Sequence, residues 1–220
     1  MKIPKGEIQK FQVSLTEEQK IAKARILHNS ITLLKGKAGS AKTFLACNVA
    51  LDLLAKRQVE RIFVSRPFIY AQGEEDLGIL PGGVRDKLIG ITTPILENMY
   101  IIATKEKVEK YIEDGKIVIL PSVFMKGMTL PNAVIILDEY QNATSHVTYT
   151  ALTRLGKGSK IIATGDMTQC DLRDKKDSGF AFFKALQIQG LPGFEIIELT
   201  SNHRHDVVDS ITSIYLDYKN

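Results

Sequence analysis

The sequence predicts an α/β fold of three layers, in which helices cover both faces of a largely parallel central sheet. Six short runs rich in Val, Ile and Leu are typical of strands that are buried on both faces. Helical patterns separate most of these runs, and such alternation favours parallel strands joined by crossover helices. The expected strands cover residues 31–34, 61–65, 116–120, 133–137, 160–164 and 194–199, and the expected helices cover residues 17–28, 43–56, 84–100, 105–113, 145–155, 178–187 and 206–218.

The first helix is expected to begin at a capping box, in which Thr16 and Gln19 satisfy each other's backbone N–H groups. The long connection after the second strand is rich in Gly and Pro and contains the turn signal Pro-Gly-Gly at 81–83. Together with the helices that follow, it predicts an elaboration around residues 66–115 at the edge of the sheet. The 220 residues are otherwise expected to form one domain.

The composition is that of an ordinary globular protein, with 44% hydrophobic and 25% charged residues. The net charge of +4 is compatible with a polyanionic partner but too small to argue for one. The two cysteines, Cys47 and Cys170, form no metal-ligand cluster and are expected to be reduced. With no signal-peptide pattern and no long apolar run, we expect a cytoplasmic protein without a membrane partner.

A glycine-rich segment between the first expected strand and the following helix is typical of a phosphate-binding loop. It consists of Gly36, Lys37, Ala38, Gly39, Ser40, Ala41, Lys42 and Thr43. Backbone N–H groups converge in such a turn, and the helix N-terminus adds partial positive charge. In this arrangement Lys42 reaches the β- and γ-phosphates and the Thr43 hydroxyl ligates Mg²⁺. The sequence therefore predicts binding of a nucleoside triphosphate with Mg²⁺.

One position departs from the pattern G-x-x-x-x-G-K-[ST], because Ala41 stands where the second glycine is expected. A methyl group at this position can crowd the backbone that approaches the phosphate. Two functions therefore stay open. One is an enzyme that hydrolyses the nucleotide, and the other is a nucleotide-binding assembly or regulatory module with little turnover.

An acidic pair, Asp138 and Glu139, directly follows the apolar run at 134–137. Ligands of open α/β sheets bind at the carboxyl ends of the strands, so we expect this pair to face the phosphate-binding loop. Asp138 would hold Mg²⁺, and Glu139 would accept a proton from the attacking water or orient it. A small-molecule kinase need not activate water, so the pair favours hydrolysis of the nucleotide.

Two more polar segments follow expected strands at the same edge. Gln169 is expected to hydrogen-bond the γ-phosphate and the attacking water, with Asp166 orienting its neighbours. Arg204 is expected to neutralise the charge that develops on the γ-phosphoryl group. The alternative for Arg204 is a surface position near the start of the last helix.

Together these segments resemble the PhoH-like ATPase family, which is related to the first RecA-like domain of superfamily 1 helicases. The phosphate-binding loop is similar to the family's G-x-A-G-T-G-K-T, residues 138–142 to D-E-A-Q-N, and residues 164–172 to T-G-D-x-T-Q-x-D-L. Residues 65–67 with 77–82 resemble T-R-P and L-G-F-L-P-G, and residues 124–130 resemble Y-M-R-G-R-T-L. Ala41 and Tyr140 are the departures. The resemblance implies a single P-loop ATPase domain over residues 1–220 with a RecA-like core, ATP as the nucleotide, and no appended nuclease activity.

The resemblance also implies roles outside the phosphate site. An N-terminal glutamine binds adenine in superfamily 1 helicases, so Gln19 is a candidate for that role as well as for capping. Segments after the second strand and around residues 124–130 correspond to contacts with single-stranded nucleic acid. The candidates are Ser65, Arg66, Pro67, Phe68, Tyr70, Phe124, Lys126 and Thr129. Aromatic and cationic side chains on exposed loops suit base stacking and phosphate contact, but the aromatic residues can equally belong to the core.

Helicases of this type close the nucleotide site with a second domain that supplies an arginine. For a single core domain, the resemblance leads us to expect a homo-oligomer, as a hexameric ring, in which Arg154 or Arg66 acts on a neighbouring subunit. The expected function is an ATPase that couples hydrolysis to single-stranded nucleic acid, with RNA favoured, in the manner of a helicase.

Overall fold

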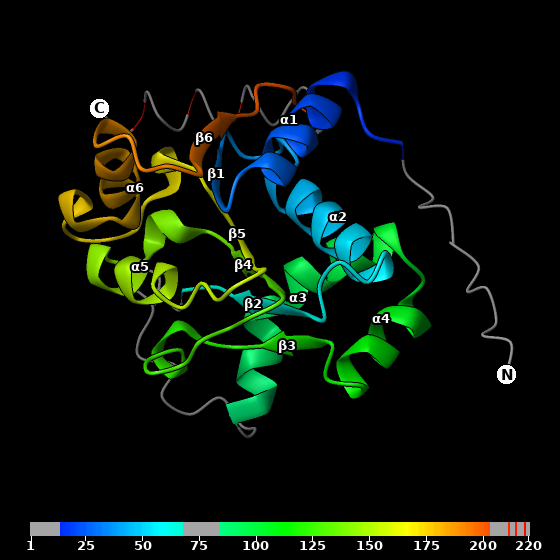
Figure 1. Ribbon diagram of the computed structural model, residues 1–220. Coiled ribbons are helices and arrows are strands. Elements are labelled where there is room, and N and C mark those ends of the chain that lie inside the picture. The colour runs from blue at the N-terminus through cyan, green and yellow to red at the C-terminus, as the bar shows by residue number, and fades with distance from the viewer. Residues whose placement is uncertain (1–13, 68–83, 203–210, 212–213, 215–217, 219–220) are drawn as a thin grey trace, which may run out of the picture.

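A six-stranded sheet forms the centre of the computed structural model, which describes residues 14–67, 84–202, 211, 214 and 218 (Figure 1). The strands are β1 (Ile31–Lys35), β2 (Arg61–Ser65), β3 (Ile117–Ile119), β4 (Ala133–Leu137), β5 (Lys160–Gly165) and β6 (Phe194–Glu198). They lie in the order β3-β2-β4-β5-β1-β6, and every neighbouring pair is parallel. The predicted α/β fold is confirmed, and among the described strands the sheet is wholly parallel.

Helices cover both faces of the sheet (Figure 1). One face carries α1 (Glu17–His28), α2 (Lys42–Ala55), α3 (Val84–Ile102) and α4 (Lys105–Glu113), and the other carries α5 (Ser145–Leu152) and α6 (Gly179–Ile188). Four short 3-10 helices, which the sequence did not predict, are η1 (Ser122–Phe124), η2 (Tyr140–Asn142), η3 (Met167–Gln169) and η4 (Lys175–Asp177). The expected helix at 206–218 lies mostly outside the described residues. Within the part of the chain that is described, no helix combines the length and apolarity needed to cross a bilayer.

The continuous apolar character of the strands follows from burial on both sides. Successive side chains of a strand point to opposite faces, so neighbouring residues join different cores. Leu34 of β1 and Ile136 of β4 pack in the core beneath α1–α4, whereas Leu33 and Ile135 pack in the core beneath α5 and α6. A strand with both faces covered needs apolar residues at every position, which is the pattern that predicted it.

The start of α1 confirms the predicted capping box. The backbone N–H of Thr16 donates to Oε1 of Gln19 (3.0 Å), and the N–H of Gln19 donates to the Thr16 hydroxyl (3.3 Å). This exchange satisfies N–H groups that the first turn of a helix leaves without partners. Gln19 is buried, and the two hydrogen bonds show its capping role directly.

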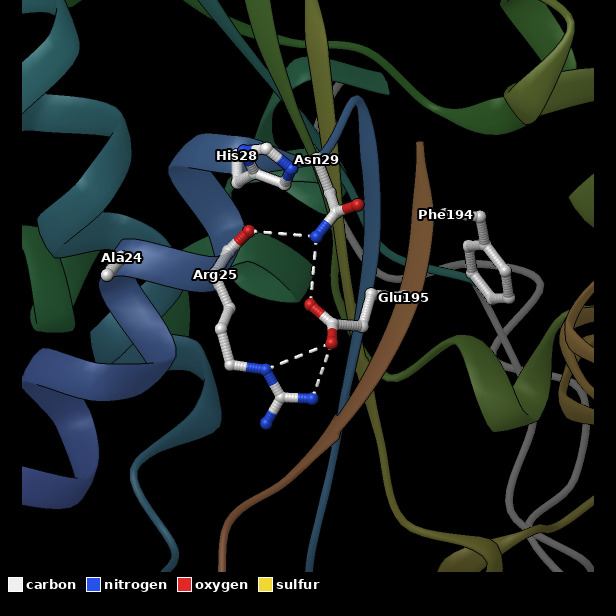
Figure 2. Close-up of a pocket in the computed structure, with 6 residues that line it drawn as sticks. All are labelled: Ala24, Arg25, His28, Asn29, Phe194 and Glu195. Carbon is white, nitrogen blue, oxygen red and sulfur yellow. Dashed lines mark hydrogen bonds and ion pairs between the residues drawn. The ribbon is translucent and has the colours of Figure 1, made fainter. Parts of the chain in front are cut away.

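At the other end of α1, residues of α1 and β6 line a pocket of about 440 Å³ (Figure 2). The pocket is lined by Ala24, Arg25, His28, Asn29, Phe194 and Glu195. The Glu195 carboxylate accepts from the Arg25 guanidinium (3.0 and 2.6 Å) and from Nδ2 of Asn29 (2.8 Å). Because β6 begins here, the pocket lies at the amino edge of the sheet, away from the carboxyl edge where ligands of such folds bind. Its polar groups serve to hold α1 against the sheet.

Candidate nucleotide site

The glycine-rich segment connects β1 to α2 as a tight loop. Gly39 (φ 88°) and Ala41 (φ 60°) both adopt left-handed backbone conformations, and α2 begins at the next residue, Lys42. The Lys42 ammonium donates to the carbonyl oxygens of Gly36 (2.6 Å) and Lys37 (2.8 Å). The lysine therefore folds back across the loop and lies where a phosphate chain bound to the loop would meet it.

Gly36 also sets how the loop packs on the sheet. A Cβ atom at this position would lie 2.4 Å from the carbonyl oxygen of Leu199 and 2.6 Å from Oγ of Ser40. Only glycine permits so close an approach to the backbone that follows β6. The loop is thus held against the carboxyl ends of both β1 and β6.

The loop and the acidic pair meet at Asp138, which follows β4. The hydroxyl of Thr43 donates to Oδ1 of Asp138 at 2.7 Å, and the hydroxyl of Thr164, near the end of β5, donates to the same oxygen at 2.7 Å. Asp138 and Thr164 are buried. Because β5 lies between β4 and β1 in the sheet, these two hydrogen bonds join the ends of three strands into one site.

The second carboxylate oxygen of Asp138 faces Arg66. A guanidinium nitrogen of Arg66 lies 3.7 Å from Oδ2, and the backbone N–H of Asp138 donates to the carbonyl of Ser65 (2.9 Å). The end of β2 is therefore part of the same cluster. In this arrangement the Arg66 guanidinium contacts the predicted metal ligand of its own subunit.

Glu139 is oriented by a glutamine that the sequence did not predict as a site residue. Glu139 has a left-handed backbone (φ 53°), and its Oε2 accepts from Nε2 of Gln141 (2.6 Å). Gln141 is buried, and its Oε1 accepts from the backbone N–H of Asp166 (3.1 Å). One amide side chain thus connects the acidic pair to the loop that carries Gln169.

That loop is itself ordered by Asp166. Its carboxylate accepts from Nε2 of Gln169 (2.9 Å) and from both the backbone N–H (2.9 Å) and the hydroxyl (2.7 Å) of Thr168. The expectation that Asp166 orients its neighbours agrees with these contacts. The structure therefore brings Gln169 to the same edge as Glu139, with Gln141 between them.

Two functional candidates were missed by sequence reasoning, namely Gln141 and Thr164. Both lie within motifs that were recognised, but only as neighbours of acidic residues. The available signal was a polar residue at the end of an apolar strand for Thr164, and a glutamine two residues after the acidic pair for Gln141. Neither signal shows which carboxylate the side chain will contact.

In the first turn of α1, Glu18 holds the segment that follows β6. Its carboxylate accepts from the backbone N–H of Ser201 (3.2 Å) and from the N–H and hydroxyl of Thr200 (both 2.8 Å). Hydrogen bonds from Ser201 and Thr200 lower the pKa of Glu18 to about 2. The held segment leads toward Arg204, which lies outside the described residues.

The residues predicted to contact single-stranded nucleic acid lie in two regions, around η1 and at the end of β2. Phe124 is 60% exposed, and Lys126 and Thr129 are exposed, so this loop presents an aromatic ring and a cation to solvent. Ser65 is buried at the end of β2, Pro67 is half-buried, and Phe68 and Tyr70 lie outside the described residues.

Arg154 lies after α5, and its guanidinium donates to the carbonyl oxygen of Met128 (3.0 Å) and to the hydroxyl of Thr153 (2.9 Å). Leu155, the next residue, forms a bridge with Leu130, just before β4 begins. Arg154 therefore lies toward the amino edge of the sheet, away from Asp138. Its contacts hold the loop that follows η1.

The chemistry of the donor set fits a hard divalent cation. Thr43 and Asp138 offer a hydroxyl and a carboxylate within hydrogen-bond distance of each other, and oxygen ligands of this kind suit Mg²⁺. Mg²⁺ keeps several waters and takes phosphate oxygens in nucleotide sites, so two protein oxygens suffice. Among the described residues, no group of three His, Cys, Asp or Glu side chains forms a metal site of another kind.

A loop of this shape at the end of β1, a lysine folded across it and an aspartate on a neighbouring strand define a P-loop protein with a RecA-like core. Comparison with known proteins then gives the family. The family profile described as "PhoH-like protein" matches residues 13–216, and the chain belongs to this family.

Curated relatives agree over most of the chain. It is 37% identical to a PhoH-like protein of Bacillus subtilis over 194 residues, covering 87% of this chain and 60% of that protein. It is 36% identical to a PhoH-like protein of Synechocystis over 192 residues (86% and 58%) and 37% identical to one of Mycobacterium tuberculosis over 193 residues (87% and 54%). The chain thus spans between about half and three fifths of the length of these relatives.

Solved structures share the fold at low sequence identity. The large terminase of a thermophilic bacteriophage has a TM-score of 0.55 at 11% identity, covering 91% of this chain and 50% of that chain. A SWI2/SNF2 ATPase core from Sulfolobus solfataricus in complex with dsDNA has a TM-score of 0.50 at 14% identity, covering 87% and 45%. These similarities support the fold.

Proposed function

We propose that this protein is an ATPase whose hydrolysis is coupled to single-stranded nucleic acid, with RNA favoured. The observation that carries the ATPase part is the 2.7 Å hydrogen bond between Thr43 and Asp138, which are 95 residues apart in sequence. It joins the loop that would hold the phosphates to the carboxylate that would hold the metal. Lys42 lies across the same loop, so the three groups needed for a magnesium nucleotide are adjacent.

In this proposal each residue has a separate task. Thr43 and Asp138 would hold Mg²⁺, which neutralises charge on the β- and γ-phosphates when bound. Glu139 accepts a proton from the attacking water or orients it, and the bond from Gln141 fixes its direction. Gln169, held by Asp166, contacts the γ-phosphate.

Two proposed roles concern the rim of the site. Arg204 would stabilise the charge developing on the γ-phosphoryl group. Gln19 would contact adenine in addition to its observed capping role. We propose ATP as the nucleotide that the site binds. We propose the cytoplasm as the location of the protein.

Phosphate release tests the ATPase proposal directly. The wild-type protein is expected to release phosphate from Mg·ATP, and Glu139→Gln is expected to bind Mg·ATP but to lose at least about 100-fold in rate, the size of a lost general base. Glu113→Gln, an exposed glutamate at the end of α4, is the matched control and should keep the wild-type rate. Full turnover in Glu139→Gln would remove Glu139 from the mechanism.

Coupling to nucleic acid is supported by the exposed segment that begins with Phe124, the last residue of η1. Phe124 offers a ring for stacking and Lys126 a cation for the backbone, which is the combination that single-stranded nucleic acid binders use. Single-stranded RNA is expected to raise the rate of phosphate release more than single-stranded DNA does. Equal rates with and without either polymer would contradict this part of the proposal and leave the ATPase part intact.

We also propose that copies of the chain assemble, with a hexameric ring as the form tested. In a ring, an arginine of one subunit can complete the site of its neighbour. Arg66 and Arg154 would have to leave their contacts with Asp138 and Met128 to do so. Mass in solution together with the dependence of specific activity on protein concentration tests the ring. A monomer with full, concentration-independent activity would refute it.

A second candidate function is a nucleotide-binding assembly module with little turnover. The left-handed backbone of Ala41 favours it, because the residue before Lys42 carries a methyl group in a conformation that suits glycine. Tight Mg·ATP binding with negligible phosphate release, with or without RNA, would select this function over the first.

A further inference from the structure

Three buried hydroxyl groups form a chain at the carboxyl edge of the sheet. Oγ of Ser65 lies 2.9 Å from Oγ of Ser122, which lies 2.7 Å from the hydroxyl of Tyr140. All three residues are buried, and Tyr140 is fully so. Ser65 is the last residue of β2, and Ser122 and Tyr140 follow β3 and β4; the three strands are neighbours in the order β3-β2-β4. The hydroxyl chain therefore ties together the ends of three adjacent strands.

Each end of this chain adjoins the proposed nucleotide site. Tyr140 directly follows Glu139, and Ser65 directly precedes Arg66, whose guanidinium faces Asp138. The carbonyl of Ser65 also accepts from the backbone N–H of Asp138. A displacement of Asp138 and Glu139 would therefore displace the groups at both ends of the hydroxyl chain.

The middle of the chain adjoins a different surface. Ser122 is the first residue of η1, which ends at Phe124, and the Phe124 ring is 60% exposed. Met125, the next residue, is fully buried and anchors the loop in the core beneath α5 and α6. The position of the exposed ring therefore depends on where Ser122 and Met125 are held.

The hydroxyl chain is suited to transmit a displacement. A buried hydroxyl that loses its partner costs about 1–3 kcal/mol, so linked groups tend to move together. The Tyr140 phenol can both donate and accept a hydrogen bond, so it can stay paired with Ser122 when the linked groups move. The ring packs in the core, and the hydroxyl is the only part of the side chain that can hydrogen-bond.

We propose that Tyr140 is a positioning residue whose hydroxyl couples the nucleotide state of Asp138 and Glu139 to the loop at residues 122–128. Binding of a magnesium nucleotide at Asp138 shifts the end of β4, and the chain through Ser122 carries that shift to Phe124. Coupling is reciprocal, so a ligand on the loop changes nucleotide affinity by the same factor. The inference rests on the proposed nucleotide site and adds to it the route by which that site reaches a second surface.

Amide hydrogen exchange with and without Mg·ATPγS tests the coupling. In the wild-type protein, nucleotide is expected to protect residues 36–43 and to change exchange at residues 122–128 by about 5-fold or more, the lower range of allosteric coupling. Tyr140→Phe keeps the ring and removes only the hydroxyl. It should retain protection at 36–43 and lose most of the change at 122–128.

Two further variants make the test specific. Ser122→Ala removes the middle of the hydroxyl chain and should reproduce the effect of Tyr140→Phe. The double variant should lose no more of the nucleotide-dependent change at residues 122–128 than either single variant does. Tyr149→Phe, on an exposed tyrosine of α5, is the matched control and should behave as the wild type. Thermal unfolding of each variant verifies that all are folded.

The outcomes separate this inference from the proposed function. A wild-type protein without protection at residues 36–43 would overturn nucleotide binding and, with it, the coupling. Protection at 36–43 without any change at 122–128 would overturn the coupling alone. An undiminished change at 122–128 in Tyr140→Phe and Ser122→Ala would show that another route carries it and would likewise overturn the role of Tyr140.

Discussion

The hydroxyl of Thr43 and the carboxylate of Asp138 meet at 2.7 Å, although 95 residues separate them along the chain. Thr43 is at the start of α2, and Asp138 follows β4, two strands away from β1. The meeting is possible because parallel strands bring all their carboxyl ends to one edge. A second hydrogen bond to Oδ1, donated by the hydroxyl of Thr164, also holds the carboxylate in place.

Replacing Thr43 is expected to weaken the use of Mg²⁺ rather than the fold. Thr43→Ala removes one proposed metal ligand, so the Mg²⁺ concentration for half-maximal phosphate release should rise about 10-fold or more. Thr43→Ser keeps the hydroxyl, so its Mg²⁺ concentration for half-maximal phosphate release should stay near that of the wild type. Titration of Mg²⁺ at saturating ATP gives the measurement. Identical Mg²⁺ dependence in Thr43→Ala and the wild type would exclude the residue as a ligand.

Gln141 is expected to act on the rate of hydrolysis through Glu139. Gln141→Leu removes the donor to Glu139 and the acceptor for the N–H of Asp166. We expect kcat to fall about 10- to 100-fold with little change in KM for ATP, because the phosphates are held elsewhere. The unpaired N–H of Asp166 should also cost about 1–3 kcal/mol of stability.

Steady-state kinetics and urea unfolding measure both effects of Gln141→Leu. Gln187→Leu, at an exposed position of α6, is the matched control and should leave kcat unchanged. If Gln141→Leu raised KM as much as it lowered kcat, the side chain would be acting on nucleotide binding, and the positioning role would be wrong.

The order of strands and helices could be predicted because it depends on local patterns. Apolar runs and helical spacing placed all six strands to within two residues at each end. Helix ends carry a weaker signal, and α5 ends at Leu152 instead of residue 155. The reason is that the N–H groups of Arg154 and Leu155 bond to carbonyls three residues back, which continues the chain as a tighter turn.

The site could be predicted only in part. Lys42, Thr43 and Asp138 were expected together because the loop and the strand end both lie at the ligand-binding edge of such sheets. The bond from Gln141 to Glu139 and the hydroxyl chain of Tyr140 depend instead on a left-handed backbone at Glu139 and on side chains from separate elements. No sequence spacing encodes such contacts.

Glu18 makes the stability of the protein depend on pH in an acidic window. Its pKa is lowered from 4.5 to about 2 in the folded protein, so the carboxylate stabilises the fold fully above its unfolded pKa and loses this effect as the pH falls through about 2. Because solvent screens the partly exposed group, we expect Glu18→Gln to cost about 1 kcal/mol at neutral pH.

The difference in unfolding free energy between the wild type and Glu18→Gln should be constant from neutral pH to about 5 and should shrink below about 4.5. Urea unfolding at several pH values provides the measurement. Glu17→Gln, at a neighbouring and highly exposed side chain, is the control and should show a smaller effect. A difference that does not change with pH would show that the hydrogen bonds to Thr200 and Ser201 do not require the charge.

Ala41 is expected to be less favourable than glycine at the same position. A left-handed conformation costs an L-residue about 1–2 kcal/mol, whereas glycine pays about 0.5–1 kcal/mol in lost chain entropy. Ala41→Gly should therefore raise the free energy of unfolding by about 0.5–1 kcal/mol. Ala38→Gly is the control, because Ala38 is not among the residues with positive φ. This substitution should lower the free energy of unfolding of the protein.

The same variant separates the two proposed functions. If the methyl group of Ala41 crowds the backbone near the phosphates, Ala41→Gly should raise kcat while the affinity for Mg·ATP stays the same or improves. If the protein is already an efficient ATPase, kcat should change little and only stability should rise. A loss of stability in Ala41→Gly comparable to that of Ala38→Gly would contradict the strain at this position, and the argument for slow turnover would fall with it.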